Sequence, residues 1–228
     1  GGIYCRANAT FINVDVSRNS SDGDGGGIST FNSNLNILNS SINKNSGNLG
    51  GGISTENSTL FISNSIINEN LGYEGAGIFT SGSSGLLSLF NVTISNNIAD
   101  YFSGGVSGDL MLNIKNTIIY NNSPDEIYVV DSSIVFIRYC NIKNGWEGEG
   151  NINADPLFCD PENSDYRLSA NSPAVGSGQN GVNMGALGVG CGGSLSNNEY
   201  IIPTGYLLHQ NYIKKLKSVI HIFQKHLE

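Results

Sequence analysis

Two short signatures recur together five times along this chain, and their spacing constrains the fold more than any other feature. The first is Gly-Gly-Ile or a near variant, and it occupies residues 1–3, 26–28, 51–53, 76–78 and 104–106. The second is Asn-x-x-(Ile/Val)-x-x-Asn, and its copies begin at Asn13, Asn39, Asn64, Asn91 and Asn116, which are 26, 25, 27 and 25 residues apart. A period of this length is typical of a solenoid, in which one repeat cannot bury its apolar face alone.

Apolar residues alternate with other residues inside each unit, which predicts strands rather than helices. In the third unit, Leu60 and Ile62 alternate with Phe61 and Ser63. A period of two places one set of side chains on one face of a strand, whereas an amphipathic helix needs a longer stretch at a period of 3.6. We therefore predict an all-β fold, a right-handed parallel β-helix of about six coils about 4.8 Å apart, with a short helical C-terminal tail.

Stacking in register turns equivalent residues into columns along the inside. One expected column is apolar and consists of Val16, Ile42, Ile67, Ile94, Ile119 and Ile142. A second is an inner ladder of the first asparagines, Asn13, Asn39, Asn64, Asn91 and Asn116. Asparagine tolerates the left-handed backbone of a sharp corner, and stacked amides can hydrogen-bond from coil to coil. The Gly pair is expected at another corner, where a positive φ angle is required.

These residues carry a resemblance to known families. The Gly pair with its Ile, followed by (Ile/Val)-x-x-Asn, resembles the repeats of the polymorphic outer-membrane proteins and related bacterial surface β-helices. Residues 151–190 resemble a segment that often closes such β-helices, on Asn-Ala-Asp-Pro-Leu-Phe at 153–158, Asp-Tyr-Arg-Leu at 165–168, Ser-Pro-Ala at 172–174 and Gly-Ala-Leu-Gly at 185–188. The resemblance implies a secreted or outer-membrane-associated bacterial protein of pectin lyase-like fold, which hosts adhesins, passenger domains and polysaccharide lyases alike.

The chain divides into three parts. We expect coils over residues 1–150, a closing segment over residues 151–193, and a linker with a tail over residues 194–228. Residues 203–212 resemble the opening of a C-terminal sorting domain of bacterial type IX secretion, but residues 213–217 depart from the Pro-Asn-Pro-Phe run that usually follows, so the sorting sequence is degenerate. Residues 212–226 instead carry apolar side chains at helical spacing among lysines, which predicts a short basic amphipathic helix.

Charge and histidine placement exclude several functions. Residues 1–198 hold 7 Lys and Arg against 17 Asp and Glu, a net charge of −10, and residues 199–228 hold 4 Lys against 2 Glu, a net charge of +2. The body therefore lacks the basic footprint of a nucleic-acid binder. All three histidines lie in the tail, so the coils hold no Ser-His-Asp triad and no His-based zinc site, and we expect no metal and no cofactor. The chain starts inside a repeat signature and without Met, which we interpret as part of a longer chain.

The four cysteines leave one pairing open. Cys5 and Cys140 fall five coils apart, about 24 Å along the axis at about 4.8 Å per coil. That separation exceeds the roughly 7 Å between Cα atoms that a disulfide allows. Cys159 and Cys191 flank the closing segment, and they either bridge it or remain buried thiols.

One outward face is the candidate site for chemistry. If Leu112 and Ile137 point inward, Lys115 and Arg138 point outward on adjacent coils, and Asp109 and Asp131 lie a few residues before them. β-Helix lyases combine acidic residues on a metal with a Lys or Arg base. The expected binding residues are three outward aromatics of the same sheet, Phe61, Phe90 and Phe136. The alternative is a solvated face whose aromatics are covered by another part of the protein.

The leading functional hypothesis is a non-enzymatic structural or adhesive module at the cell surface or in the medium. It would display an extended face to extracellular polysaccharide or to a host or neighbouring cell. The rival is a carbohydrate-active enzyme, a polysaccharide lyase or hydrolase using the face of Lys115 and Arg138, and a third reading is a carbohydrate-binding module without catalysis. An acidic cluster facing the two cations would favour the enzyme, and a flat aromatic strip without such a cluster would favour the binding module. Absence of both features would favour the stalk.

Overall fold

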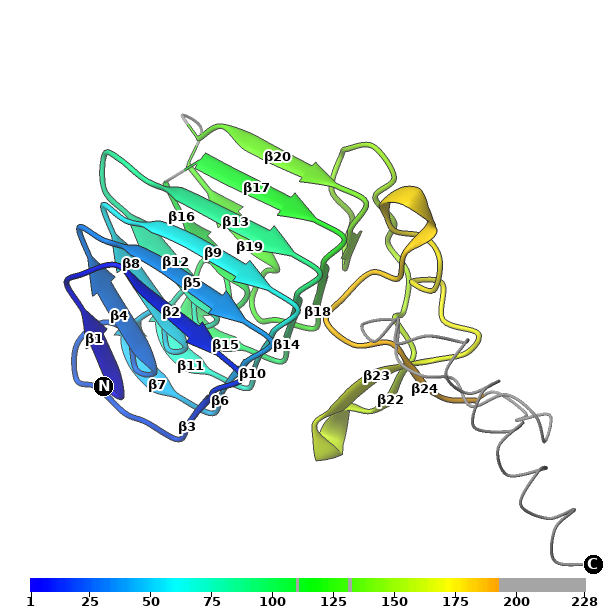
Figure 1. Ribbon diagram of the computed structural model, residues 1–228, viewed down its shortest axis with the longest axis horizontal. Coiled ribbons are helices and arrows are strands. Elements are labelled where there is room, and N and C mark those ends of the chain that lie inside the picture. The colour runs from blue at the N-terminus through cyan, green and yellow to red at the C-terminus, as the bar shows by residue number, and fades with distance from the viewer. Residues whose placement is uncertain (110, 131–132, 193–228) are drawn as a thin grey trace, which may run out of the picture. The chain divides into compact units, whose positions relative to one another are not determined.

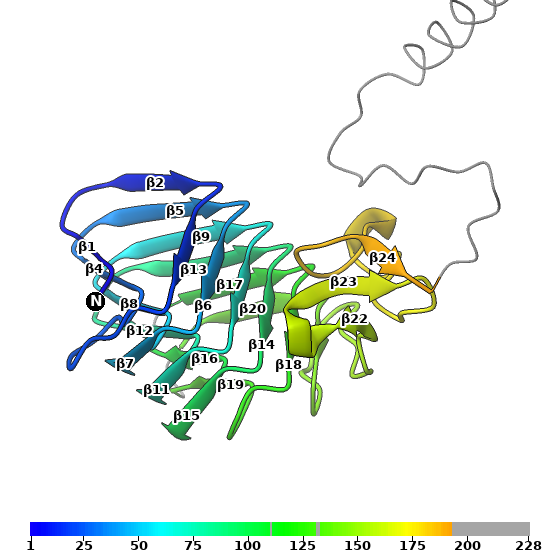
Figure 2. The ribbon, with the colours of Figure 1, turned by 90° about the horizontal axis from the view of Figure 1, so that it is seen from below.

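The computed structural model describes residues 1–109, 111–130 and 133–192, which form a right-handed parallel β-solenoid of about seven turns (Figures 1 and 2). The expected fold class is confirmed. The described residues belong to one compact unit, and the helical elements within them are two short 3-10 turns, η1 (Pro161–Asn163) and η2 (Gln179–Gly181). The tail helix expected at residues 212–226 lies outside the described residues.

The turns contribute parallel strands to three long sheets and one short one. Sheet A consists of β1 (Ile3–Cys5), β4 (Ile28–Phe31), β8 (Ile53–Glu56), β12 (Ile78–Ser81), β16 (Val106–Gly108) and β19 (Ile127–Val129). Sheet B consists of β2 (Ala9–Ile12), β5 (Asn34–Leu38), β9 (Thr59–Ser63), β13 (Leu86–Phe90), β17 (Met111–Lys115) and β20 (Val135–Arg138). Sheet C consists of β3 (Asp15–Ser17), β6 (Ser41–Asn43), β10 (Ile66–Asn68), β14 (Thr93–Ser95), β18 (Ile118–Tyr120) and β21 (Asn141–Ile142). The short sheet D consists of β7 (Ser46–Leu49), β11 (Leu71–Glu74) and β15 (Ile98–Tyr101).

The structure has one turn more than the six expected, because a part-turn without either signature is added at the C-terminal end. The Ile142 backbone N–H donates to the Ile152 carbonyl at 3.0 Å, and the Ile152 N–H donates to the Cys140 carbonyl at 2.8 Å. Trp146 packs, partly buried, against the end of the core. The pairing is therefore made by a segment that the repeat pattern does not mark.

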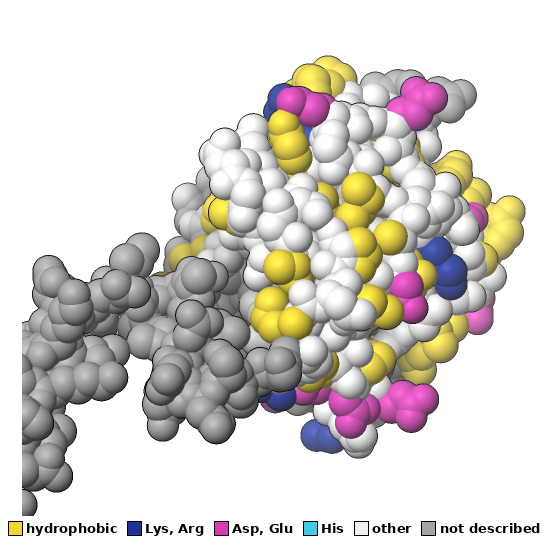
Figure 3. Space-filling view, turned by 90° about the vertical axis from the view of Figure 1, so that its right-hand side faces the viewer, with side chains coloured by type: hydrophobic (Ala, Val, Ile, Leu, Met, Phe, Trp, Pro, Cys, Tyr) yellow, Lys and Arg dark blue, Asp and Glu magenta, His cyan; other side chains and the backbone are white. Residues whose placement is uncertain are grey.

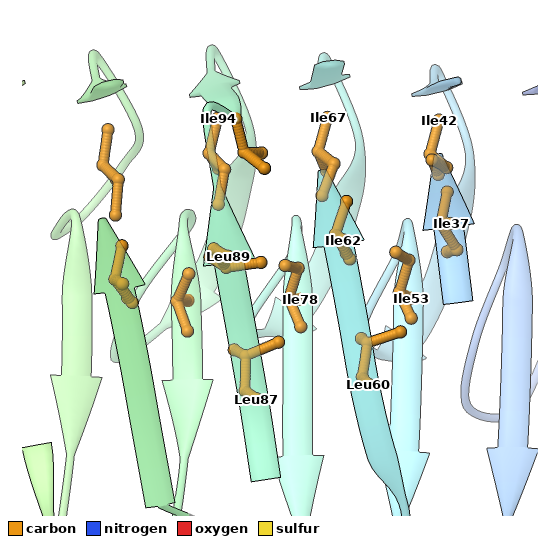
Figure 4. Packing of buried hydrophobic residues seen from close by; sticks show 14 of the residues in the cluster. Ile37, Ile42, Ile53, Leu60, Ile62, Ile67, Ile78, Leu87, Leu89 and Ile94 are labelled. Carbon is orange, nitrogen blue, oxygen red and sulfur yellow. The ribbon is translucent and has the colours of Figure 1, made fainter. Parts of the chain in front are cut away.

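Strict register between neighbouring turns builds the core from columns. Ile42 pairs with Ile67, and Ile67 pairs with Ile94. The members of this column from sheet C are buried, from Val16 at 6% exposed to Ile119 at 0%. Residues of sheets A and B, such as Ile53 and Leu60, point toward the same interior (Figure 4). Because every turn buries its apolar side chains against the turn before and after, no turn has an apolar core of its own.

The chain bends at corners where single residues adopt positive φ. The first asparagine of the second signature forms the corner between sheets B and C, with φ of 50° at Asn39 and 48° at Asn64. Lys44 and Glu69 occupy the next corner at 55° and 54°, and Gly50 forms a further one at 67°. Asparagine and glycine suit these positions because they enter the left-handed region at little cost.

The Gly pair has a different purpose from the one expected. Positive φ belongs to the glycine before the pair, as at Gly50, and not to the pair itself. The pair is needed for space. A Cβ atom built on Gly52 would lie 2.7 Å from the Gly77 carbonyl oxygen and 3.0 Å from Asn70 Nδ2. Glycine therefore allows neighbouring turns to approach a buried asparagine closely.

The second asparagines of the signatures form a continuous ladder, which is half-buried at Asn19 and buried from Asn45 onward. Its members are Asn19, Asn45, Asn70, Asn97 and Asn122. At each step the backbone N–H and Nδ2 of one asparagine both donate to Oδ1 of the next, as from Asn45 to Asn70 at 3.0 Å each. From Asn45 onward, Nδ2 also donates to a carbonyl of the preceding turn, as from Asn70 to Ile42 at 3.0 Å. Each interior amide therefore joins three turns and leaves no polar group unpaired, as burial requires.

The first asparagines, expected as the inner ladder, lie at the corners instead. Asn13, Asn39 and Asn64 are exposed, and Asn91 and Asn116 are half-buried. Two ladder bonds do connect them, from Asn64 Nδ2 to Asn39 Oδ1 at 3.3 Å and from Asn91 Nδ2 to Asn64 Oδ1 at 3.2 Å, both at the surface. The first asparagines therefore share the positive φ of the corner, whereas the buried hydrogen bonds belong to the second asparagines.

The closing segment folds back over the outer face of sheet C. Its sheet consists of β22 (Phe158–Asp160), β23 (Asp165–Ser169) and β24 (Val189–Cys191), and Cys159 and Cys191 form a disulfide with Cα atoms 5.8 Å apart. The alternative of two free thiols there is thus excluded. Tyr166, 1% exposed, accepts hydrogen bonds at its hydroxyl from Asn68 Nδ2 at 3.3 Å and Asn96 Nδ2 at 3.0 Å. A second small core beneath the segment includes Ile118, Leu168, Ala174 and Met184.

The close approach at the Gly pair predicts a site-specific effect of adding one methyl group. We expect Gly52→Ala to lower the free energy of unfolding by about 1–3 kcal/mol, since the turns must separate to admit Cβ. Gly188→Ala is the control, because a Cβ there would meet nothing within 4 Å. Urea unfolding followed by circular dichroism measures both, and equal stability of the two variants would contradict this account of the pair.

The two asparagine columns predict unequal losses on truncation. Asn70→Ala strands two buried donors of Asn45, so we expect a loss of about 3 kcal/mol. Asn64→Gly keeps a residue that tolerates positive φ and removes only exposed hydrogen bonds, so a loss of about 1 kcal/mol is expected. Chemical denaturation of both variants tests the assignment, and a larger loss at position 64 would reverse it.

Candidate functional site

The two cations singled out in the sequence lie side by side on the outer face of sheet B. Lys115 in β17 pairs in register with Arg138 in β20, and Phe90 in β13 pairs with Lys115 on its other side. Arg138 is exposed and Lys115 is half-buried. The alternation of the strands places these side chains together as expected.

The acidic partners required for lyase chemistry are not brought to the cations by the described residues. Asp109 precedes β17 and Lys115 ends it, and the four steps between the first and last residues of this five-residue strand span about 13 Å at about 3.3 Å each. Asp131 lies outside the described residues. Within residues 1–109, 111–130 and 133–192, no three His, Cys, Asp or Glu side chains form a group that could hold a metal ion.

The three aromatics expected on sheet B form a pair and a separate residue. The rings of Phe61 and Phe90 have centroids 5.6 Å apart and are tilted by 34°. Phe136 is 50% exposed, but Ser88 and Asn113 stand between it and Phe61 in the same column. Among its described residues, sheet B therefore has no continuous flat aromatic strip.

The free thiols offer no nucleophile near neutral pH. Burial raises the pKa of Cys140 to about 12, so its thiol stays protonated. Cys5, at the other end of the solenoid, is partly buried, and that burial also raises its pKa.

A different surface, the outer face of sheet D, carries most of one exposed apolar patch that the sequence did not single out. Leu71 and Ile98 pair in register and are 49% and 52% exposed. Tyr73 and Tyr101 are 49% and 51% exposed, and their rings stack at a centroid distance of 5.9 Å with 13° between the planes. We call these four residues the sheet D face. Exposed apolar side chains grouped in this way commonly mark a binding surface.

The sheet D face is anchored by a second pair of stacked rings. Phe102 packs edge-on against Tyr101 with centroids 4.2 Å apart, and it stacks on Tyr128 of sheet A with centroids 4.1 Å apart. Phe102 has a φ of 54° at the corner where the preceding turns have glycine. Its ring thus holds Tyr101 in place at the expense of an unfavourable backbone conformation.

A groove of about 530 Å³ borders the sheet D face on the side of the closing segment. Leu71 and Ile98 line it together with Pro161 and Glu162 across the gap. Lys44 and Glu69 also line the groove but are already paired with each other at 3.5 Å, and Glu69 accepts a further bond from Asn68 at 2.8 Å. The groove therefore presents apolar side chains beside a rim whose polar groups are largely satisfied.

The repeats contained a weak signal for the sheet D face. The stretches Leu71-Gly72 and Ile98-Ala99 place a large side chain outward and a small one inward, next to the Gly pair. A small inward residue is needed there because a Cβ on Gly72 would lie 3.2 Å from the Ala76 backbone. A short strand whose apolar residues point outward lacks the alternation that distinguishes a half-buried strand from a loop. Sequence periodicity therefore does not reveal these residues.

Charged side chains are sparse on one side of the molecule. On the side seen in Figure 3, hydrophobic side chains form small groups, and charged ones are few and scattered. Within the part of the chain that the structure describes, no helix has the length and apolar character needed to cross a membrane.

In comparisons with known proteins, no family model matches the chain, and neither a curated protein nor a solved structure matches it.

Proposed function

We propose that the chain is a non-enzymatic display module of a secreted or cell-surface protein, and that the sheet D face is its binding surface. The observation that carries the proposal is the group of Leu71, Tyr73, Ile98 and Tyr101, each about half exposed on two neighbouring strands. Hydrogen bonds to the adjacent turns hold these strands in register, so the face is presented by a preorganised backbone.

The location outside the cell rests on the disulfide and on the repeats. A disulfide persists in an oxidising compartment such as the periplasm or the cell exterior. Cys159 and Cys191 join the two edges of the closing segment, which in turn covers sheet C. The repeat signatures resemble those of bacterial surface β-helices, in agreement with the same location.

The partner that we propose is a glycan, on extracellular polysaccharide or on another cell. A sugar ring has C–H faces bordered by hydroxyl groups, and tyrosine likewise combines an apolar ring with a polar hydroxyl. Asp100 lies exposed between Ile98 and Tyr101 and provides a hydrogen-bond acceptor for sugar hydroxyls. This chemistry differs from that expected on sheet B, where two cations would attract acidic polymers.

The sheet D face predicts a loss of glycan binding when its rings are removed. We expect Tyr73→Ala/Tyr101→Ala to weaken binding to immobilised glycans by about tenfold or more, since each aromatic contact contributes about 0.5–1.5 kcal/mol. Tyr4→Ala is the control, because Tyr4 is 59% exposed on sheet A, away from this face. A glycan array and whole-cell binding would be measured together. Unchanged binding of the double variant would mean that the sheet D face is not the binding surface. Binding of the wild type to cells but not to glycans would indicate a protein partner instead of a glycan.

The cation pair on sheet B allows a direct test against the enzymatic alternative. We expect no unsaturated uronate product from acidic polysaccharides, with or without calcium, because no described acidic cluster faces Lys115 and Arg138. Absorbance near 235 nm follows such product, with Lys115→Ala/Arg138→Ala as the matched variant. Product that is formed by the wild type and lost in the variant would overturn the non-enzymatic proposal.

A further inference from the structure

The buried asparagine ladder ends at Asn122 with donors that need an acceptor. Ile119 pairs in register with Ile142, so the position after Asn122 in the ladder, three residues farther on, is Gly145. Glycine has no side-chain acceptor. The backbone N–H and Nδ2 of Asn122, 6% exposed, would therefore lack the partner that Asn97 finds in Asn122.

Glu126 supplies the missing acceptor from within the same turn. Its carboxylate oxygens lie 3.2 Å from the Asn122 backbone nitrogen, and Oε2 lies 2.5 Å from Asn122 Nδ2. The side chain is 5% exposed. Each backbone N–H and Nδ2 of the ladder donates to the asparagine of the following turn, from Asn19 toward Asn122, so this carboxylate stands at the end where no further asparagine accepts those bonds.

No described cation compensates the buried carboxylate by an ion pair. Both ion pairs found among residues 1–109, 111–130 and 133–192 lie elsewhere, at Lys44 and at Arg167. Lys143 is the cation that acts on Glu126, but its Nζ donates to Asn121 Oδ1 at 3.2 Å and lies 5.7 Å from the centre of the Tyr120 ring. Burial therefore raises the pKa of Glu126, against the opposing effects of the Asn122 and Asn121 donors and of Lys143.

Two further groups complete the electrostatic surroundings. Glu126 and Asp155 both raise the pKa of the Tyr120 phenol, although burial of Tyr120 is the larger cause. Asp125, next to Glu126 in the chain, is exposed. Neither Asp125 nor Asp155 provides a positive charge that could compensate Glu126.

We propose that Glu126 makes the end of the ladder a pH-sensitive clasp, which tightens when its carboxyl group takes up one proton. The neutral group keeps a carbonyl oxygen that accepts from Asn122 and no longer places an uncompensated charge inside the solenoid. The clasp controls the turn that carries residues 122–129, where sheet A ends at β19. This property is independent of the proposed binding at the sheet D face.

The direction of the pH dependence follows from proton binding. Folding raises the pKa of such a carboxyl group. At any pH between its unfolded pKa of about 4.3 and its folded pKa, the group therefore binds more protons in the folded state than in the unfolded state. Its stabilising contribution is complete below the unfolded value and is lost as the pH rises through the folded value. Mild acidification should therefore strengthen this end of the solenoid.

Hydrogen exchange of the Asn122 backbone N–H measures the clasp locally. Between about pH 7.5 and about pH 5, we expect its protection factor to rise, by up to about tenfold for each unit that separates the two pKa values. Glu126→Gln keeps the shape of the side chain without a titrating group, and its Asn122 protection should not change with pH. Glu56→Gln removes one charge at an exposed position and serves as the control for net charge.

The carboxyl titration of Glu126 in the wild type, followed by ¹³C NMR, decides the matter if Glu126→Gln does not fold. A midpoint above that of the exposed glutamates supports the clasp. A midpoint at or below theirs overturns it, and so does a pH response of Asn122 that is the same in Glu126→Gln and in the wild type.

Discussion

The ladder of second asparagines is the interaction on which the rest of the structure depends. A side-chain amide that donates to the turn after it and to the turn before it can do so only at the spacing of neighbouring strands. This requirement sets the register, and the register in turn aligns the apolar columns of Val16, Ile42 and Ile67. It also explains the Gly pair, since turns that approach an amide this closely leave no room for Cβ at Gly52. Apolar contacts alone would tolerate a shift of one turn against the next along the strand direction, whereas buried amides lose hydrogen bonds as soon as they are displaced.

Much of this architecture was predictable, because the repeat length and the alternation within each unit both indicate stacked strands. The identity of the inner asparagines was not. Asn39 continues the inward alternation of Leu35 and Ile37, so extrapolation places it inside, but β5 ends at Leu38 and the chain turns at Asn39. Once the backbone enters the left-handed region, a period of two no longer says which way the side chain points. The purpose of the Gly pair was mispredicted for a related reason, since both close approach and positive φ favour Gly and only the folded structure distinguishes the two causes.

The candidate surfaces show the same contrast. Alternation predicts which residues of neighbouring strands lie together, but it does not predict contacts between residues far apart in the chain. Alternation within β17 and β20 suffices to place Lys115 beside Arg138. It says nothing of the distance from Asp109, which depends on where the strand begins, and nothing of Tyr166, whose partners Asn68 and Asn96 lie 98 and 70 residues away in the chain. The stacking of Tyr73, Tyr101, Phe102 and Tyr128 likewise joins residues of different turns. Sheet D is short, so neither its strand lengths nor its polarity stand out in the sequence.

The closing segment has a consequence for how this chain can change in evolution. Its described hydrogen bonds to the solenoid reach Asn68 and Glu69 in the third turn, Thr93 and Asn96 in the fourth, Asn116 in the fifth and Asn141 in the sixth. Gain or loss of a whole unit among these turns would change the spacing of the residues that bond to the closing segment. The same event within residues 26–50 would leave that spacing unchanged. Descendants of this sequence should therefore differ in length near the first two turns, while the number of turns that bond to the closing segment stays constant.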